Sequence, residues 1–213
     1  MLVGVEDVTL DVVPNPFLDA IRRHSEFFNP ERQPASARAR HRLQQLKDAL
    51  CYRYSYALPS PELLGVLAAN APLVEMGAGR GYWASLLRAG GVDIIAYDEC
   101  PAAQGEAIVD NQYLAPAHAY AYTDVLRGGP KELIRHPDRA LFLCWPPVNN
   151  MAEDCLKWFQ GDTLIYLGTG SQGMDAPDRF FEKLVRRWTP EASFPVEPSA
   201  WDVNERMTVY RQR

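Results

Sequence analysis

Short apolar runs alternate with amphipathic segments from about residue 59 onward, and this rhythm predicts an α/β fold. The apolar runs are expected to form strands, and the intervening segments helices that cover both faces of the sheet. The last two runs follow each other without a helix, which predicts an antiparallel pair. The expected strands are 72–77, 92–97, 118–123, 140–145, 163–168, 192–197 and 206–212, and the expected helices are 61–70, 82–89, 130–135, 149–159 and 177–188. The sequence therefore predicts a Rossmann-like, mostly parallel sheet of seven strands.

The first part of the chain follows a different pattern, which predicts an N-terminal helical cap or lid over residues 1–58 and an α/β domain over 59–213. Two helices are expected in the cap, at 17–28 and 36–51, with Ser36 as an N-cap. After them come Tyr52, Tyr54 and Tyr56, which a two-residue period would place on one face of an extended segment.

Composition narrows the class of protein. The chain has 213 residues, 47% of them hydrophobic and 23% charged, as expected of one ordinary globular unit with an extension. A net charge of −5 gives no general attraction to nucleic acid. The four cysteines and four histidines lack metal-site spacing, so no metal is expected, and the thiols are expected to be reduced. We find no signal-peptide pattern and no apolar run long enough to span a membrane, which predicts a cytoplasmic protein.

The segment Leu-Val-Glu-Met-Gly-Ala-Gly-Arg-Gly-Tyr at 73–82 carries the strongest functional signal. An apolar strand runs into a turn with three alternate glycines, and a second strand ends on Asp98, 23 residues after Glu75. Glycine permits a positive φ and a close ligand approach, while a helix N-terminus and an acid can bind a nucleoside. Tyr82 stands where the dinucleotide fingerprint has Gly or Ala, and no Gly-Lys-Ser/Thr ends the turn. The pattern thus favours neither NAD nor a P-loop nucleotide.

The pattern E-x-G-x-G-x-G followed by Asp98 resembles motif I of the class I S-adenosylmethionine (SAM)-dependent methyltransferases. The resemblance covers about residues 60–213 and implies SAM as the cofactor and a strand order of 3-2-1-4-5-7-6. It implies that Asp98 holds both ribose hydroxyls and that the glycines face the methionine and sugar parts. Glu75 either orients the turn or accepts from the SAM ammonium, directly or through water. Asp124 and Val125 match the residues that meet the adenine amine and ring. The expected cofactor-binding residues are Glu75, Gly77, Gly79, Gly81, Tyr82, Asp98, Asp124, Val125 and Cys144.

After the expected fourth strand, Cys144-Trp145-Pro146-Pro147-Val148-Asn149 resembles motif IV of the amino-methyltransferases, which reads Asp/Asn-Pro-Pro-Tyr/Phe. Trp145 replaces the Asp or Asn, and Val148 replaces the aromatic residue. An indole offers a donor and a flat face but no acceptor. The departure argues against methylation of N6-adenine, N4-cytosine or glutamine, and Trp145 could instead form the floor of a pocket.

Methyl transfer needs a collinear nucleophile, methyl and sulfur, and a hard nucleophile also needs a nearby base. No base stands out, since the four histidines are isolated. The expected catalytic residues are Tyr54, Tyr56, Trp145 and Asn149, with Asn150 beside them, if the N-terminal segment folds over the site.

The sequence thus predicts a SAM-dependent methyltransferase for a small molecule, with secondary metabolism as one setting. Two alternatives remain open. One is a non-methylating enzyme on the same fold, which promotes a displacement or ring closure in natural-product biosynthesis. The other is a non-catalytic, methyltransferase-like subunit of a heteromeric complex. Homo- and hetero-oligomers are both left open, while membrane and nucleic-acid partners are not expected.

Overall fold

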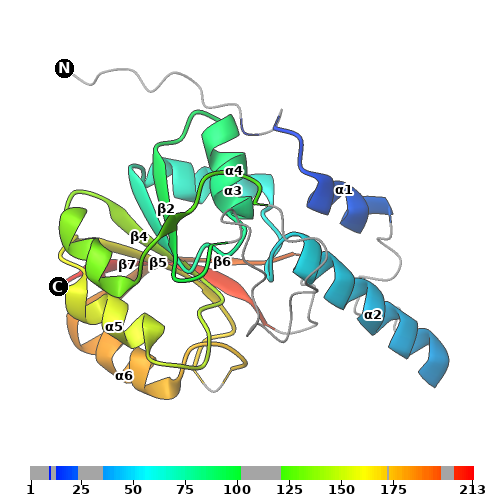
Figure 1. Cartoon of the computed structure of the whole chain (residues 1–213). Coiled ribbons are helices and arrows are strands. Elements are labelled where there is room, and N and C mark those ends of the chain that lie inside the picture. The colour runs from blue at the N-terminus through cyan, green and yellow to red at the C-terminus, as the bar shows by residue number, and fades with distance from the viewer. Residues whose placement is uncertain (1–9, 11–12, 24–35, 102–120, 172, 198–203) are drawn as a thin grey trace.

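A seven-stranded sheet forms the middle layer of the molecule, in the order β3-β2-β1-β4-β5-β7-β6 (Figure 1). The computed structural model describes residues 10, 13–23, 36–101, 121–171, 173–197 and 204–213. Strand β7 runs antiparallel to both of its neighbours, and the other pairs are parallel. The strands are β1 (Leu73–Met76), β2 (Ile94–Asp98), β3 (Leu126–Arg127), β4 (Ala140–Cys144), β5 (Thr163–Gly168), β6 (Trp188–Pro195) and β7 (Arg206–Gln212). The predicted number of strands and their order are confirmed.

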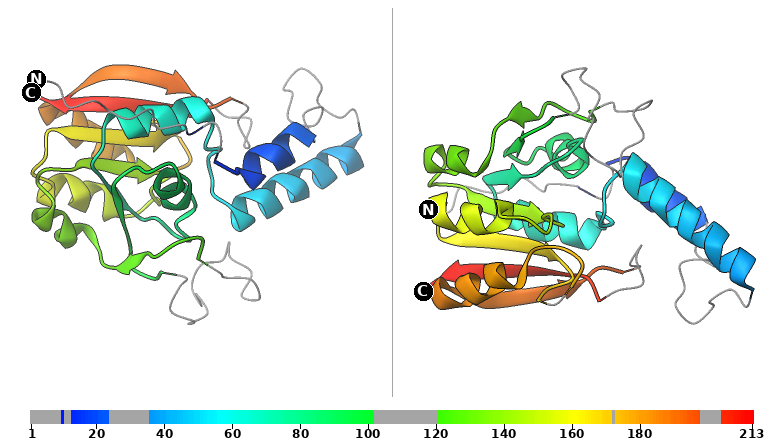
Figure 2. Two further views of the ribbon diagram at one scale, coloured as in Figure 1. Left: turned by 90° about the horizontal axis from the view of Figure 1, so that it is seen from above. Right: turned by 60° about the horizontal axis from the view of Figure 1, so that its bottom comes forward.

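Helices cover both faces of this sheet, as Figure 2 shows from two directions. One face carries α3 (Pro61–Ala69) and α4 (Tyr82–Ala89), and the other carries the 3-10 helix η5 (Pro130–Arg135), α5 (Met151–Trp158) and α6 (Asp178–Arg187). Alternate strand residues feed two separate cores: Leu73 and Phe142 face α3 and α4, whereas Val74 and Leu141 face α5 and α6. The period of two within each strand thus builds a three-layer α/β structure.

The start of α3 shows how local sequence sets an element boundary. The Ser60 hydroxyl oxygen accepts from the Leu63 amide at 3.3 Å, and Pro61 occupies the first turn, where its missing N–H leaves no bond unmade. Leu63, Leu64 and Leu67 are then buried against the sheet. The helix therefore begins and packs as the sequence predicts.

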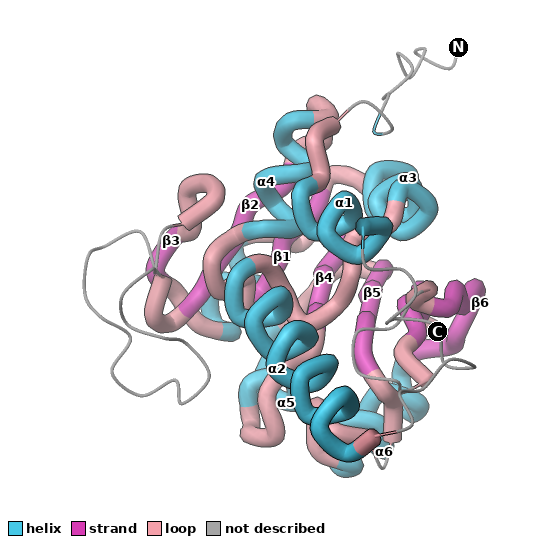
Figure 3. The backbone as a smooth tube through the Cα atoms, turned by 90° about the vertical axis from the view of Figure 1, so that its right-hand side faces the viewer, coloured by secondary structure: helices cyan, strands magenta, loops and turns pink. Residues whose placement is uncertain are grey.

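The N-terminal segment lies across the carboxyl ends of the parallel strands (Figure 3). It forms α1 (Pro16–Arg23) and α2 (Ala37–Arg53), and the N-terminal half of α2 extends away from the sheet (Figure 1). Phe17, Ile21, Leu50 and Leu58 are buried in the same core as α3 and α4. The described part of the predicted cap therefore packs directly on the α/β layers.

Most boundaries differ from the sequence prediction by one or two residues, and three differences are larger. The strand expected at 118–123 is not found among its described residues, since β3 is the short pair Leu126–Arg127. Alternating Ala and Tyr resemble a strand, but Arg88 binds Thr123 and Asp124 outside the ladder. Helix α2 continues to Arg53, so Tyr52 is helical and the three tyrosines do not share an extended face. Strand β6 begins at Trp188, before the expected 192, and it pairs with β7 on both sides of a register shift between Pro190 and Ala192.

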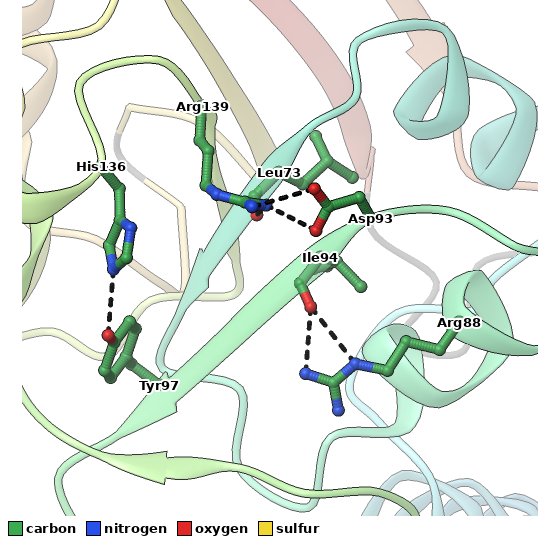
Figure 4. A network of polar contacts seen from close by, with 7 residues as sticks. All are labelled: Leu73, Arg88, Asp93, Ile94, Tyr97, His136 and Arg139. Atoms are coloured by element: carbon green, nitrogen blue, oxygen red, sulfur yellow. Dashed lines mark hydrogen bonds and ion pairs between the residues drawn. The ribbon is translucent and has the colours of Figure 1, made fainter.

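The amino edge of the sheet is fastened by Arg139, which precedes β4. Its guanidinium donates to both Asp93 carboxylate oxygens at 2.8 and 2.9 Å and to the Leu73 carbonyl at 3.2 Å (Figure 4). This bidentate pair joins the starts of β1 and β2 at the edge opposite α2. Within the described ranges, none of the helices combines the length and apolar character needed to cross a bilayer.

Candidate functional site

The glycine turn between β1 and α4 is folded as its sequence predicts. Gly77, Gly79 and Gly81 all have positive φ, at 79°, 55° and 71°. The amides of Gly77 and Ala78 both donate to the Tyr97 carbonyl at 2.9 Å, which fixes the turn against β2. Gly81 then serves as the left-handed N-cap of α4. Glycine is required here because other L-residues rarely adopt this conformation.

Asp98, the last residue of β2, faces this turn. One carboxylate oxygen accepts from the Gly79 amide at 2.8 Å, and the other accepts from the Cys100 amide at 2.8 Å. The side chain is half-buried. An acid is therefore held at the carboxyl end of β2 directly beside the glycine turn, where ligands of parallel α/β sheets bind.

Glu75 lies beneath the turn and is 2% exposed. Burial raises the pKa of its carboxyl to about 8, an effect that Asp98 reinforces and that Arg88 and the Ala84 amide oppose. One oxygen, Oε2, has no hydrogen-bond partner among the described residues. The contact with the Ala84 amide, in the first turn of α4, agrees with the predicted role of Glu75 in orienting the turn. The oxygen without a partner leaves its predicted role toward a ligand open as well.

The adenine-side residues follow the turn. Val125 is buried, and its Cγ2 would lie 2.8 Å from a Cβ placed on Gly81. Asp124 is exposed, and its carbonyl accepts from the Arg88 guanidinium at 2.7 Å. Arg88 also donates to the Ile94 carbonyl at 3.0 and 3.2 Å (Figure 4). Arg88 therefore joins α4, β2 and the segment before β3.

Tyr82 has a buried environment that explains the bulky residue in this slot. Its hydroxyl donates to Asn15 Oδ1 at 2.9 Å and accepts from the Phe17 amide at 3.1 Å. Its ring lies 5.1 Å from that of Tyr54 and 4.8 Å from that of Tyr122, centroid to centroid. Tyr82 thus joins α1 and the end of α2 to the glycine turn. Its contact with a cofactor stays a prediction.

We call the glycine turn 77–81 with Glu75 and Asp98 the cofactor edge, and the group formed by Tyr56, Cys144, Trp145 and Glu205 the acceptor edge. In the acceptor edge, Trp145 has a φ of 46°, and its indole N–H donates to Glu205 Oε1 at 2.6 Å. The Tyr56 and Trp145 rings stack at 5.6 Å with an interplanar angle of 19°. Burial raises the pKa of the Cys144 thiol well above its usual value, so the thiol stays protonated.

The predicted catalytic residues are brought together only in part. Tyr56 and Trp145 meet, and Tyr54 packs beside Tyr82 and Tyr122 instead. Asn149 is exposed, and its side-chain oxygen accepts from the Met151 amide at 2.8 Å at the start of α5. A catalytic role for Asn149 thus stays a prediction, while its observed contact is local to the helix start.

The histidines whose placement is described lie away from both edges. His136 contacts the Tyr97 hydroxyl at 3.0 Å (Figure 4), in the layer of α5, and burial lowers its pKa. His41 is exposed on α2. His24 and His118 lie outside the described residues. No described histidine is therefore placed as a base.

Sequence reasoning missed Glu205, Arg88 and Asn15. Glu205 is 2% exposed at the acceptor edge, yet it precedes β7 in a stretch without any motif. Arg88 and Asn15 act through partners 36 and 44 residues away in the chain. In the sequence, each of them is only a polar residue within or beside an apolar segment. Most surface residues show the same pattern, so it does not single them out.

Comparison with known proteins finds similarity in three dimensions only. No family model and no curated protein matches the chain. A 1,6-didemethyltoxoflavin-N1-methyltransferase from Burkholderia thailandensis is 14% identical, with a TM-score of 0.47 over 84% of this chain and 92% of that chain. The magnesium protoporphyrin IX methyltransferase of Synechocystis is 11% identical, with a TM-score of 0.42 over 100% of both chains. An N-methyltransferase from Bradyrhizobium japonicum is 12% identical, with a TM-score of 0.41 over 93% of this chain and 99% of that chain.

The sheet itself defines the class of fold. Its order of 3-2-1-4-5-7-6, with β7 alone antiparallel, is the order that the resemblance to class I methyltransferases implies. The glycine turn and Asp98 occupy the carboxyl ends of β1 and β2 in this sheet. The chain therefore has a Rossmann-like α/β fold of the methyltransferase type.

Proposed function

We propose that this chain is a SAM-dependent methyltransferase that acts on a small molecule. One observation carries the proposal: the Gly79 amide and the Asp98 carboxylate lie together, 2.8 Å apart, at the carboxyl ends of β1 and β2. A turn with three positive-φ glycines lets a ligand approach the backbone, and the adjacent acid can accept from ribose hydroxyls.

The residues present fit the cofactor. The buried Glu75 Oε2 lacks a partner among the described residues, and a buried polar atom normally has one. An ammonium group from SAM, bound directly or through water, would satisfy it. Asp98 would hold the two ribose hydroxyls, and the turn at 77–81 would face the methionine and the sugar. Asp124 would meet the adenine amine, and Val125 the adenine ring.

When bound, SAM supplies a methyl group on a positively charged sulfur. The contribution of the chain is then to place the acceptor in line with that group and to exclude water. The N-terminal segment suits this role, because α1 and α2 lie across the carboxyl edge (Figure 3) and bring Tyr54 and Tyr56 to it. Trp145 and Tyr56 would form one wall of the acceptor pocket.

A second candidate function is a non-methylating displacement or ring closure on the same fold. The specific observation in its favour is the Trp145 side chain, which offers no acceptor and whose N–H already donates to Glu205. Mass spectrometry of the product separates the two functions, because methylation adds the mass of one methylene group.

Binding of SAM measured by calorimetry tests the proposal. Asp98→Ala removes the carboxylate expected to accept from the ribose, and hydrogen bonds to charged groups contribute about 1.5–3 kcal/mol. We therefore expect the Kd for SAM to rise by about 10- to 100-fold. Asp93→Ala is the matched control, because Asp93 lies at the opposite edge of the sheet and pairs with Arg139.

The two variants give distinct outcomes. Asp93→Ala should bind SAM within about twofold of the native protein, since only its distant ion pair is lost. Native protein that binds neither SAM nor S-adenosylhomocysteine would contradict the proposed function. An unchanged Kd in Asp98→Ala would show that the ligand lies elsewhere.

A further inference from the structure

The first helix of the N-terminal segment begins against the hydroxyl of Tyr82. This hydroxyl accepts from the Phe17 amide at 3.1 Å and donates to Asn15 Oδ1 at 2.9 Å, and both contacts are buried. Asn15 Oδ1 also accepts from the Leu18 amide at 3.0 Å. The first amides of a helix have no partner within the helix. Tyr82 therefore completes the N-terminus of α1, although it follows Phe17 by 65 residues in the chain.

The end of α2 is held from the same turn. The carbonyl of Arg53, the last residue of α2, accepts from the Tyr122 hydroxyl at 2.7 Å and from Arg80 Nη1 at 3.4 Å. The Tyr122 amide in turn donates to the Arg80 carbonyl at 2.8 Å. The last carbonyls of a helix also lack partners within it, and a cation is favourable at that end. Arg80 and Tyr122 thus complete the C-terminus of α2.

Aromatic rings pack between these two helix ends, from Phe17, Tyr54, Tyr82 and Tyr122. The ring centroids of Phe17 and Tyr54 lie 5.2 Å apart in a stacked arrangement. Tyr82 lies 5.1 Å from Tyr54 and 4.8 Å from Tyr122. Ring contacts at these distances are favourable beyond the area that they bury. The start of α1, the end of α2 and the glycine turn therefore form one packed unit.

Gly81 sets the positions of the two side chains that hold the helix ends. It lies between Arg80 and Tyr82, has a φ of 71° and caps α4. A turn rich in glycine has several accessible backbone conformations. A ligand in contact with the turn would restrict it to one of them, so docking of the N-terminal segment would cost less conformational entropy. Ligand binding at the turn and docking of the segment would then favour each other.

We propose that Arg80 and Tyr82 are positioning residues, which dock the N-terminal segment over the site in response to the cofactor. This inference rests on the proposed function and adds the way in which the site closes. Arg80 acts through the end of α2, and Tyr82 acts through the start of α1. The docked segment lies across the carboxyl ends of the parallel strands (Figure 3), where closure excludes water from the site.

Thermodynamic linkage makes the proposal measurable without knowledge of the acceptor. If binding and docking favour each other, undocking must become rarer in the complex by the factor that couples them. Amide hydrogen exchange reports such local opening. Mass spectrometry therefore follows exchange in residues 16–23 and 44–53, with and without S-adenosylhomocysteine at about 50 times the Kd of each protein.

The variants remove one contact at a time. Tyr82→Phe keeps the ring and removes the hydroxyl, and Arg80→Gln removes the guanidinium. Tyr166→Phe is the matched control, because its hydroxyl also donates to a side chain, that of Asp175, and accepts from an amide, that of Gly170 at 3.2 Å. Tyr166 is equally buried, at 3% exposed, but packs in the core on the α5 and α6 face.

We expect S-adenosylhomocysteine to slow exchange in both helices by at least about tenfold in native protein and in Tyr166→Phe. In Tyr82→Phe the slowing over residues 16–23 should fall to about twofold or less. Arg80→Gln should reduce the slowing over residues 44–53 to about threefold, a smaller change, because its contact of 3.4 Å is longer than an ordinary hydrogen bond.

Other outcomes would overturn the inference. Exchange that is equally accelerated in Tyr82→Phe with and without the ligand would make the hydroxyl a purely structural contact. An equal loss of slowing in Tyr166→Phe would point to a general loss of stability. If Tyr82→Phe fails to fold, native protein still decides, because binding without slower exchange in either helix contradicts this inference alone. Native protein that binds neither SAM nor S-adenosylhomocysteine overturns the proposed function as well.

Discussion

The cofactor edge and the acceptor edge lie side by side on one sheet but are built in different ways. In the cofactor edge, Gly79 and Asp98 are 19 residues apart and belong to one strand–helix–strand unit. In the acceptor edge, Trp145 depends on Glu205, 60 residues away, and on Tyr56, which belongs to the N-terminal segment. One edge is assembled by neighbouring elements and the other by distant ones.

This difference bears on how such a fold can change its substrate. The turn at 77–81 depends on backbone conformation, so its sequence has little freedom. The acceptor edge depends on side chains contributed by the segment after α2, by the end of β4 with the residue that follows it, and by the residue before β7. Those contributions can change independently while the cofactor edge stays intact. Under the proposed function, we expect specificity for the methyl acceptor to depend on this edge.

The largest effect is expected from crowding the cofactor edge. In Gly81→Ala, the new Cβ would lie 2.8 Å from Val125 Cγ2 and 3.0 Å from Thr123 Cγ2, at a φ of 71°. We expect a loss of about 2–4 kcal/mol in the free energy of unfolding, measured by urea denaturation. Gly79→Ala is the control, because its Cβ meets no atom within 4 Å and adds only left-handed strain. Equal losses in the two variants would refute the packing argument.

An intermediate effect concerns Glu75 and pH. Its folded pKa of about 8 lies above the usual carboxyl value of 4.5. The native state therefore keeps a proton that the unfolded chain releases, and the free energy of unfolding falls as pH rises between these values. The slope is at most about 1.4 kcal/mol per pH unit. Glu75→Gln should flatten the profile across this range, as followed by urea denaturation from pH 5 to 8.

Proton release on SAM binding provides a second test of the protonation state of Glu75. If the SAM ammonium meets Glu75, binding at pH 7 should release up to one proton, because the ligand charge favours the carboxylate. Calorimetry in buffers of different ionisation enthalpy measures this number. Glu75→Gln should release none, and an equal release from both proteins would contradict a contact between Glu75 and the ammonium.

The smallest effect is expected at Asn149, beside the acceptor edge. Asn149→Ala removes the acceptor for the Met151 amide, so the free energy of unfolding should fall by about 1 kcal/mol. SAM affinity should stay within about twofold. A fall in the rate of methyl transfer by the folded variant at saturating SAM would support the predicted catalytic role. The neighbouring Asn150→Ala provides the matched control, since its side chain contacts Arg179 instead.

Local sequence patterns predicted the fold well where the signals for an element lie within that element's own residues. Ser60 and Pro61 begin α3, and the apolar run 163–168 became β5 with all six residues buried. The third strand was predicted several residues before its actual position. Alternating residues at 118–123 suggest a strand whether or not a neighbouring strand is available for pairing. Pairing with β2 begins only at Leu126, after Arg88 has engaged Thr123 and Asp124.

The sequence by itself determined the cofactor edge and the alternation of strands and helices, whereas the strand order came from the resemblance to class I methyltransferases. Glycines that need positive φ, an acid at a strand end and the period of apolar residues are local properties, and each can be recognised within a short stretch. Tertiary structure alone decided the acceptor edge. Glu205 has no motif around it in the sequence, and the antiparallel register of β7 brings it, buried, to the Trp145 indole. Their chemistry arises from proximity and desolvation, which depend on the whole fold.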